Sequence, residues 1–237
     1  MKKFDITIIG GGESGYSAAR QAADLGAKVC LVERNVLGGS ILNNGIFSLR
    51  KVLTALGKFP QPQKLEEVAE NDLQLDIGKI FDKANTLSKA YSEKWKSDLE
   101  VKGVHLEIGE GSFVEVGKVE VKTLGGVELI SSEKIILATG SSPKHPDTIP
   151  FDKEMIVPLE ELTRFRELPE KVLIMDGGAH GCEMASLIRV LGCKPFLCEK
   201  GSRILPDQAP EIMDFFESQI RKKKLKLILN KGIKSIF

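Results

Sequence analysis

The stretch that decides the fold is DITIIGGGESGYSAARQAADLGAKVCLVER, residues 5–34. An apolar run typical of a buried strand leads into a glycine-rich turn, a segment with helical spacing and a second apolar run. Gly10, Gly12 and Gly15 form the pattern G-x-G-x-x-G, and Glu33 closes the second run. The first glycine permits a tight turn, the second lets a pyrophosphate approach the backbone, and the third lets the helix pack on the strand. The stretch therefore predicts a β-α-β unit that binds a dinucleotide at its helix N-terminus, with Glu33 accepting hydrogen bonds from a ribose.

A second copy of the pattern occupies residues 171–200. The segment KVLIMDGG is followed by the helix-like CEMASLIRVLG and by a further apolar run, KPFLCEK. Gly178 and Gly181 take the second and third glycine positions, and Glu199 closes the run as Glu33 does in the first copy. Asp176 stands at the first glycine position. A carboxylate beside a pyrophosphate is electrostatically unfavourable, so Asp176 disfavours nucleotide binding at this copy.

Two such units predict an α/β fold with two parallel sheets. We expect a Rossmann-like domain over residues 1–150 and a partial second Rossmann-like domain over residues 151–237. A helical insert is expected at about 64–100, because apolar residues recur there at helical spacing. The short runs VHLEIG, SFVEV, KVEVKT and VELISS predict a β-meander at about 104–138. The second domain holds roughly half of a complete unit, which predicts an open sheet edge and an exposed apolar face.

Composition restricts the partners and the compartment. The formal net charge is +1 at pH 7, which favours neither nucleic acid nor a membrane surface as an electrostatic partner. No stretch approaches the ~18–20 apolar residues that span a bilayer. The four cysteines do not form a disulfide framework, and although Cys193 and Cys198 have redox spacing, Cys198 falls inside an expected strand. Free thiols of this kind are typical of a reducing cytoplasm, where we expect the protein to lie. The sequence indicates no metal site.

Three segments resemble the flavin-dependent pyridine nucleotide-disulfide oxidoreductases, in particular the dihydrolipoamide dehydrogenase family. They are ESGYSAARQAADLGAKVCLVERNVLGGS (13–40), ATGSSP (138–143) and SRILP (202–206), and the resemblance runs from about Asp5 to the last residue. It implies that the first domain holds FAD and that the second would hold NAD(P), with NAD favoured because no arginine directly follows Glu199. The residues that it implies contact the cofactors are Gly10, Gly12, Glu13, Ser14, Gly15, Glu33, Arg34, Gly39, Ser40, Arg50, Ala138, Thr139, Gly140, Gly178, Gly181 and Glu199.

Residues 38–50, GGSILNNGIFSLR, depart from that family in the segment that it places beside the flavin. The resemblance puts its redox-active cysteine pair at Ile41 and Ile46, which cannot form a disulfide. Neither dithiol oxidation nor disulfide reduction can then use the family's usual route. Arg50 replaces a lysine near the flavin ring and is a candidate for a cation there; the alternative is a surface or ion-paired arginine. Glu183 matches an acidic position associated with the nicotinamide.

The residues leave three hypotheses open. The first is an FAD-binding oxidoreductase that transfers electrons from NAD(P)H through flavin to a small-molecule or protein acceptor other than a dithiol. The second is a non-catalytic nucleotide-binding or interaction relative. The third is an incomplete fragment, because the family's returning flavin-domain segment and C-terminal dimer domain are not in this sequence. A homodimer or a second polypeptide would then complete the fold.

Overall fold

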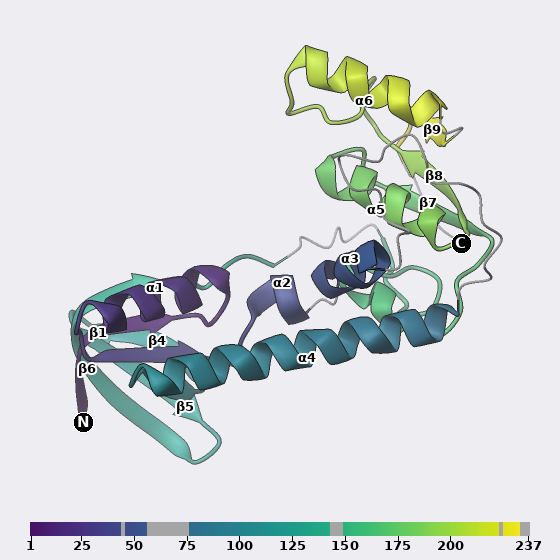
Figure 1. Cartoon of the computed structure of the whole chain (residues 1–237). Coiled ribbons are helices and arrows are strands. Elements are labelled where there is room, and N and C mark those ends of the chain that lie inside the picture. Colours follow the sequence, from purple (N-terminus) through teal and green to yellow (C-terminus); the bar gives the residue numbers. More distant parts are fainter. Residues whose placement is uncertain (44–45, 56–75, 143–148, 223–224, 233–237) are drawn as a thin grey trace. The chain divides into compact units, whose positions relative to one another are not determined.

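The structure is a computed structural model that describes residues 1–43, 46–55, 76–142, 149–222 and 225–232. It divides into two compact units (Figure 1). The first consists of Met1–Ser48 and Ala84–Lys144, and the second of Leu49–Lys83 and His145–Phe237. Each unit contains one sheet and its own apolar core.

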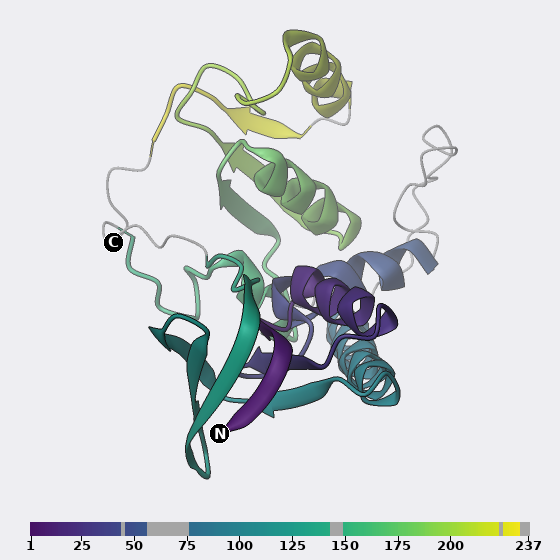
Figure 2. The same ribbon diagram turned by 90° about the vertical axis from the view of Figure 1, so that its left-hand side faces the viewer.

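The first unit is built on a six-stranded sheet with the order β3-β2-β1-β6-β5-β4. Parallel pairing joins β1 to β2 and β6, and β2 to β3, whereas β5 pairs antiparallel with β4 and β6. The glycine-rich turn therefore lies in the parallel half of the sheet, and the antiparallel half forms the curled meander seen in Figure 2. The strands are β1 (Lys2–Ile9), β2 (Val29–Glu33), β3 (His105–Ile108), β4 (Glu110–Glu115), β5 (Lys118–Thr123) and β6 (Gly126–Leu137).

Apolar side chains cover the parallel strands on both faces. Ile8 and Leu31 pack with residues of the helices, including Ala19 and Leu99. A second cluster places Ile9, Cys30 and Val32 against Val119 and Val121 of the meander. Such burial on both faces explains why the strands read as continuous apolar runs rather than as alternating ones. The helices that begin in the first half of the chain are α1 (Glu13–Asp24), α2 (Gly39–Asn43), α3 (Ile46–Ala55) and α4 (Ile77–Val101).

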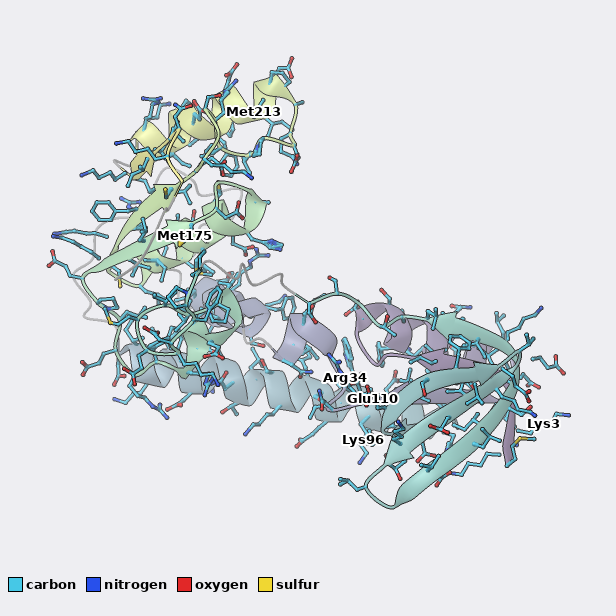
Figure 3. The ribbon with its side chains drawn as sticks, turned by 180° about the vertical axis from the view of Figure 1, so that it is seen from behind. Lys3, Arg34, Lys96, Glu110, Met175 and Met213 are labelled. Atoms are coloured by element: carbon cyan, nitrogen blue, oxygen red, sulfur yellow. The ribbon has the colours of Figure 1, made fainter. Side chains whose placement is uncertain are left out.

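The second unit repeats the β-α-β arrangement on a smaller scale. Its three strands are parallel in the order β7-β8-β9. Leu197, Ile204 and Ile220 are buried in its core, whereas Leu173 of β7 is half exposed. Figure 3 labels Met175 at the end of β7 and Met213 on α6. The elements are η1 (Leu159–Arg164), β7 (Lys171–Met175), α5 (Ala179–Val190), β8 (Lys194–Cys198), α6 (Pro210–Lys222) and β9 (Lys226–Ile228).

The α/β fold class with Rossmann-like units is confirmed, but the expectation that all four short runs form one meander is wrong. The run VHLEIG does not join the meander, because its strand β3 pairs in parallel with β2. The run VELISS does not end at a turn: it continues into KIIL as the single strand β6. One end of β6 pairs antiparallel with β5 and the other pairs in parallel with β1, so that one long strand joins the two halves of the sheet.

The helical insert is described only from residue 76 onward. The long helix expected over residues 77–99 is α4, and residues 64–75 of the predicted insert lie outside the described residues. The sole tryptophan, Trp95, stacks on Tyr16 of α1 with ring centroids 4.3 Å apart, which gives it a packing role. The domain boundary at residue 150 stays a prediction. Within the described ranges, none of the helices combines the length and apolarity that a bilayer-spanning segment needs.

Replacing Leu31 by alanine should destabilise the first unit by about 2–5 kcal/mol, because its side chain is fully buried between α1 and the sheet. Urea unfolding followed by Trp95 fluorescence measures the loss, since the only tryptophan lies in this unit. The matched control is Leu25→Ala, at a leucine that is 78% exposed, which should change stability by less than about 0.5 kcal/mol. Equal effects of the two substitutions would contradict the assignment of the core.

Candidate functional site

Two of the three motif glycines in the first unit are required by packing within the chain itself. Gly10 adopts a φ of +109°, and a Cβ atom on it would lie 2.2 Å from the carbonyl oxygen of Ala138. A Cβ on Gly15 would lie 1.8 Å from the carbonyl oxygen of Gly10. These close approaches bring the first turn of α1 directly against the carboxyl end of β1, where the backbone N–H groups of the helix start point outward.

Gly12 differs, because nothing in the described chain requires it to be glycine. It is the N-cap of α1 with φ −76° and ψ −173°, an extended conformation that any residue adopts. A Cβ placed on it would meet only the Cα of Gly39, at 3.6 Å, which is ordinary van der Waals contact. The space that a larger side chain would fill therefore lies open above the helix N-terminus. That is the position at which the motif places a pyrophosphate.

Glu33 lies beside this turn at the end of β2 and is only 9% exposed. Its carboxylate accepts hydrogen bonds from the amides of Gly11 (2.6 Å) and Asn35 (2.9 Å). Because each carboxylate oxygen has two lone pairs, the group can still accept a hydrogen bond from a ribose hydroxyl. The sequence reasoning missed Gly11, although a Cβ there would lie 2.5 Å from Leu37 and 3.0 Å from a Glu33 oxygen. The signal was present in the sequence, because Gly11 is the middle glycine of the run GGG at residues 10–12.

Several other predicted site residues meet at the same end of the sheet. Gly39 packs its backbone against Gly12, and the Ala138 amide donates to the carbonyl of Ile9. In Figure 3, Arg34 lies at this carboxyl end, far from Lys3 at the amino end of β1. The remaining residues predicted around this cradle have exposed side chains or backbone; they are Glu13, Ser14, Ser40, Thr139 and Gly140.

The segment at the two lost cysteine positions is helical. Ile41 lies in α2 and is 44% exposed. Ile46 begins α3, and its side chain lies outside the described part of the structure. Arg50, further along α3, belongs to the second unit. The residues that the family resemblance places beside the flavin, Ile41, Ile46 and Arg50, are therefore divided between the two units.

The second cradle reproduces the N-cap geometry and the close helix-to-strand packing of the first. Gly178 is the N-cap of α5 with φ −71° and ψ −173°, and a Cβ on Gly181 would lie 1.7 Å from the carbonyl oxygen of Asp176. Glu199 is 8% exposed and accepts hydrogen bonds from the amides of Gly177 (2.8 Å) and Gly201 (2.7 Å). The acidic residue at the strand end therefore holds the glycine turn in both units.

Asp176 changes the chemical groups that the second cradle presents to a ligand. Its backbone does not take a positive φ, so the turn forms without the glycine that Gly10 supplies in the first unit. Its side chain folds back, and one carboxylate oxygen accepts a hydrogen bond from the amide of Gly178 at 2.9 Å. Glycine at 178 and 181 and the acid at 199 fit a dinucleotide, whereas this carboxylate does not fit its pyrophosphate.

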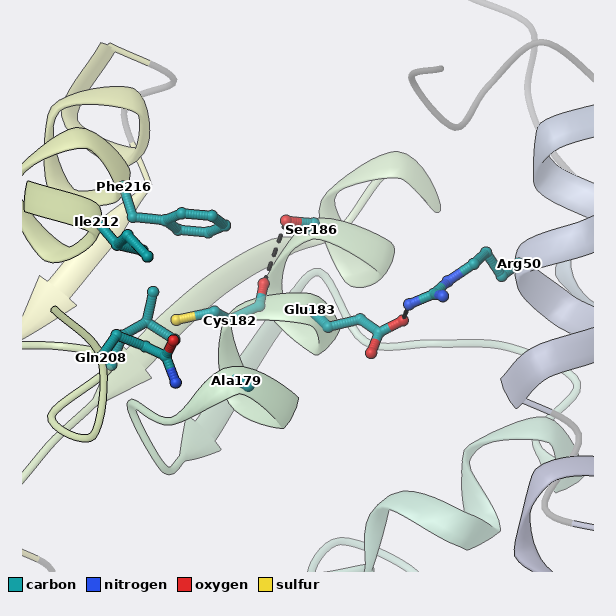
Figure 4. A pocket seen from close by; sticks show the side chains of 9 residues that line it. Arg50, Ala179, Cys182, Glu183, Ser186, Gln208, Ile212 and Phe216 are labelled. Atoms are coloured by element: carbon teal, nitrogen blue, oxygen red, sulfur yellow. Dashed lines mark hydrogen bonds and ion pairs between the residues drawn. The ribbon is translucent and has the colours of Figure 1, made fainter. Parts of the chain in front are cut away.

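An open pocket of about 420 Å³ lies in the second unit between α5 and α6 (Figure 4). Cys182 and Ser186 line it from α5, and Ile212 and Phe216 line it from α6. At one side of it the guanidinium of Arg50 forms an ion pair with the carboxylate of Glu183. The two residues that the sequence associated with flavin and nicotinamide are therefore in direct contact. Their roles towards those groups stay predictions.

Comparison with known proteins supports the family resemblance. The sequence matches, over residues 4–236, the family described as pyridine nucleotide-disulphide oxidoreductase. It is 28% identical to a dihydrolipoyl dehydrogenase of Chlamydia muridarum, over 98% of this chain and 51% of the relative. It is 30% identical to that of Chlorobaculum tepidum, over 93% of this chain and 48% of the relative. The chain spans about half the length of these relatives.

A solved structure shows the same fold. The Cu(II) complex of the HOCl-induced flavoprotein disulfide reductase RclA from Escherichia coli superposes with a TM-score of 0.83 at 24% identity. The match covers 100% of this chain and 51% of that chain.

All four cysteines are free and buried: Cys30, Cys182, Cys193 and Cys198. Burial raises the pKa of the Cys182 thiol to about 11, and the nearby carboxylates of Asp176 and Glu199 add to the shift. Burial likewise raises the pKa of Cys30 to about 12. Within the described residues, no group of three or more His, Cys, Asp or Glu side chains is arranged to hold a metal ion.

Cys182 should react with Ellman's reagent at pH 8 about 100-fold more slowly in the folded chain than in urea. A pKa of about 11 in place of 9.0 leaves about 100-fold less thiolate at that pH, and burial slows the reaction further. Ser186→Cys provides the positive control, because it adds an exposed thiol one turn further along α5. Rapid modification of Cys182 in the native chain, detected by mass spectrometry, would contradict the described burial.

Proposed function

The chain belongs to the pyridine nucleotide-disulphide oxidoreductase family, and from this premise we propose that it binds FAD at the cradle of its first unit. We further propose that it passes electrons from NAD(P)H through the flavin to an acceptor other than a dithiol. The flavin supplies the redox chemistry, and the chain supplies binding and electrostatics. The chain spans about half the length of these relatives.

The observation that carries the FAD proposal is the open space above Gly12. Packing explains Gly10 and Gly15, whose Cβ atoms would collide with backbone, but it does not explain Gly12. A glycine that the chain does not need for itself is accounted for by a ligand that approaches its backbone. The N–H groups at the start of α1 and the helix dipole favour the negative charge of a pyrophosphate there.

Neighbouring residues suit the remaining parts of such a ligand. Glu33 is held in place by two backbone amides and retains lone pairs for a ribose. Gly39 adopts a φ of +55° and lies against Gly12, so the segment after β2 borders the cradle without side-chain bulk. Gly140, with a φ of +67°, follows Ala138 at the end of β6 in the same unit. We propose that these glycines let the chain follow the ligand closely.

The burial of the thiols favours an electron acceptor other than a dithiol. Exchange with a disulfide requires a thiolate that can reach its target. Ile41 stands exposed where the family carries a cysteine, and the four cysteines that the chain does have are all buried. A quinone, oxygen or an electron-transfer protein requires no thiol. We propose an acceptor of this kind.

We retain Arg50 as the candidate for a cation beside the flavin. Its planar guanidinium can place positive charge there, and the ion pair with Glu183 restrains its orientation. In this proposal Glu183 balances the charge of Arg50 and is available to the nicotinamide. No described residue is assigned as a proton donor or acceptor in the transfer.

A second candidate function is favoured by Asp176. If its carboxylate keeps dinucleotides from the second cradle, the chain is a flavin-binding protein without a nicotinamide reaction, such as an interaction or sensory relative. The exposed side chains of Leu173 and Met175 on β7 would then serve a partner. We also propose, for either function, that a second copy or another polypeptide covers these side chains, because β7 is an edge strand of the described sheet.

Gly12→Val should weaken FAD binding about tenfold or more, because hydrogen bonds to a charged group contribute about 1.5–3 kcal/mol and the new side chain would occupy the place of the pyrophosphate. The fold should remain, since φ at this position suits any residue. Flavin content is measured from the visible absorption of the purified protein and from FAD titration of stripped protein.

The matched control is Gly125→Val in the turn between β5 and β6. A Cβ there would meet only the hydroxyl of Thr123, at 3.8 Å. This control should retain flavin as the unaltered chain does. Undiminished flavin in the Gly12 variant, or an unaltered chain that binds no FAD on titration, would end the proposal.

A further inference from the structure

The two cradles have matching helix N-caps but present different groups to a ligand. Their N-cap glycines, Gly12 and Gly178, have φ values of −76° and −71° and the same ψ of −173°. Both helices pack through a glycine whose Cβ would strike the preceding strand end. Both turns are held by the acidic residue at the end of the next strand. The first residue of the turn differs in backbone, since Gly10 has a φ of +109° and Asp176 does not take a positive φ. The second cradle also carries the carboxylate of Asp176, which the first cradle has no counterpart for.

The two cradles differ in what occupies the space above their N-cap glycines. A Cβ on Gly12 would meet only the Cα of Gly39, at 3.6 Å. A Cβ on Gly178 would instead lie 3.2 Å from each carboxylate oxygen of Asp176. One of those oxygens accepts the hydrogen bond of the Gly178 amide at 2.9 Å. In the second unit an anion from the chain itself thus stands where the first unit leaves room.

We propose that Asp176 is an intramolecular competitor of the dinucleotide, and that its carboxylate must leave the Gly178 amide before a pyrophosphate can bind there. This inference rests on the proposed function, which assigns NAD(P)H to the second cradle. The carboxylate satisfies the same N–H group and the same positive helix end that a phosphate would use. If it stayed nearby, its charge would repel the phosphate.

The competition is reversible because of where Asp176 lies. Its side chain is exposed, and one of its carboxylate oxygens accepts a hydrogen bond from a single backbone amide, that of Gly178. Water can solvate the carboxylate after it rotates away, so displacement is far less unfavourable than expelling a buried charge. Asp176 therefore lowers the affinity of the cradle for dinucleotide without abolishing it. It selects ligands that bind strongly enough elsewhere in the unit, for example through the ribose at Glu199.

A purely structural role predicts something different. A carboxylate that bonds to an amide at a helix start also stabilises the helix, and its removal then reduces stability without improving binding. The two roles are separated by an equilibrium measurement of NADH binding. This measurement also differs from flavin reduction, so that it remains informative if the proposed electron transfer fails.

The experiment measures NADH binding by isothermal titration calorimetry on the full chain saturated with FAD and reduced anaerobically with dithionite beforehand, so that NADH binds without transferring electrons. Asp176→Asn removes the charge and keeps the shape, and Asp176→Gly restores the glycine found at the first cradle. Both should lower the dissociation constant about tenfold, the effect of removing one nearby like charge. The control Glu170→Gln removes an equal charge at the amino end of β7, where Glu170 pairs with Lys194. It should change the constant by less than about twofold.

A double variant assigns the gain to this cradle. Adding Gly178→Val to Asp176→Gly places a side chain above α5, and it should cancel the gained affinity. The inference is overturned if both Asp176 variants, folded by circular dichroism, bind NADH no better than the unaltered chain. It is also overturned if the double variant keeps the gain. Improved binding without flavin reduction would instead uphold the role of Asp176 and refute the proposed transfer.

Discussion

The whole arrangement depends on the close approach of a helix start to a strand end. In the first unit a Cβ on Gly15 would lie 1.8 Å from the carbonyl oxygen of Gly10, and the second unit repeats this contact between Gly181 and Asp176. Only a residue without a side chain allows α1 and α5 to begin so near the sheet. The approach directs unpaired N–H groups of each helix outward from the carboxyl end of the parallel strands. Each sheet then provides a rigid base for one anion-binding turn.

The two units share similar turns, so residues that both turns retain are those that the fold requires, and residues that differ between them can change ligand binding. The acidic residues Glu33 and Glu199 are retained in both units, and each holds a glycine amide in its turn. They therefore contribute to the fold whether or not a ribose binds. The residue at the start of the turn differs between the units: Gly10 takes a positive φ in the first, whereas Asp176 forms the second turn without one. Ligand preference can change at this position while the unit keeps its shape.

The β-α-β units, α4 and the glycine turns could be predicted from sequence because their causes are local: helical spacing, apolar runs and glycines in a fixed pattern. The partners of β3 could not, because VHLEIG fits a meander as well as a parallel edge, and pairing is decided by tertiary contacts. The same holds for the continuous strand β6. Sequence also showed that Asp176 was unfavourable for a pyrophosphate, but not that its carboxylate would bond to Gly178. That contact depends on a side-chain orientation.

The central claim is that flavin in this chain exchanges electrons without a thiol, and anaerobic absorption spectroscopy tests it most directly. The FAD-saturated protein is mixed with NADH, and the visible absorption band of the oxidised flavin is followed before and after an acceptor is added. The account predicts bleaching by NADH, recovery with a benzoquinone and no recovery with lipoamide. A band that NADH does not bleach, or one that lipoamide restores, would contradict it.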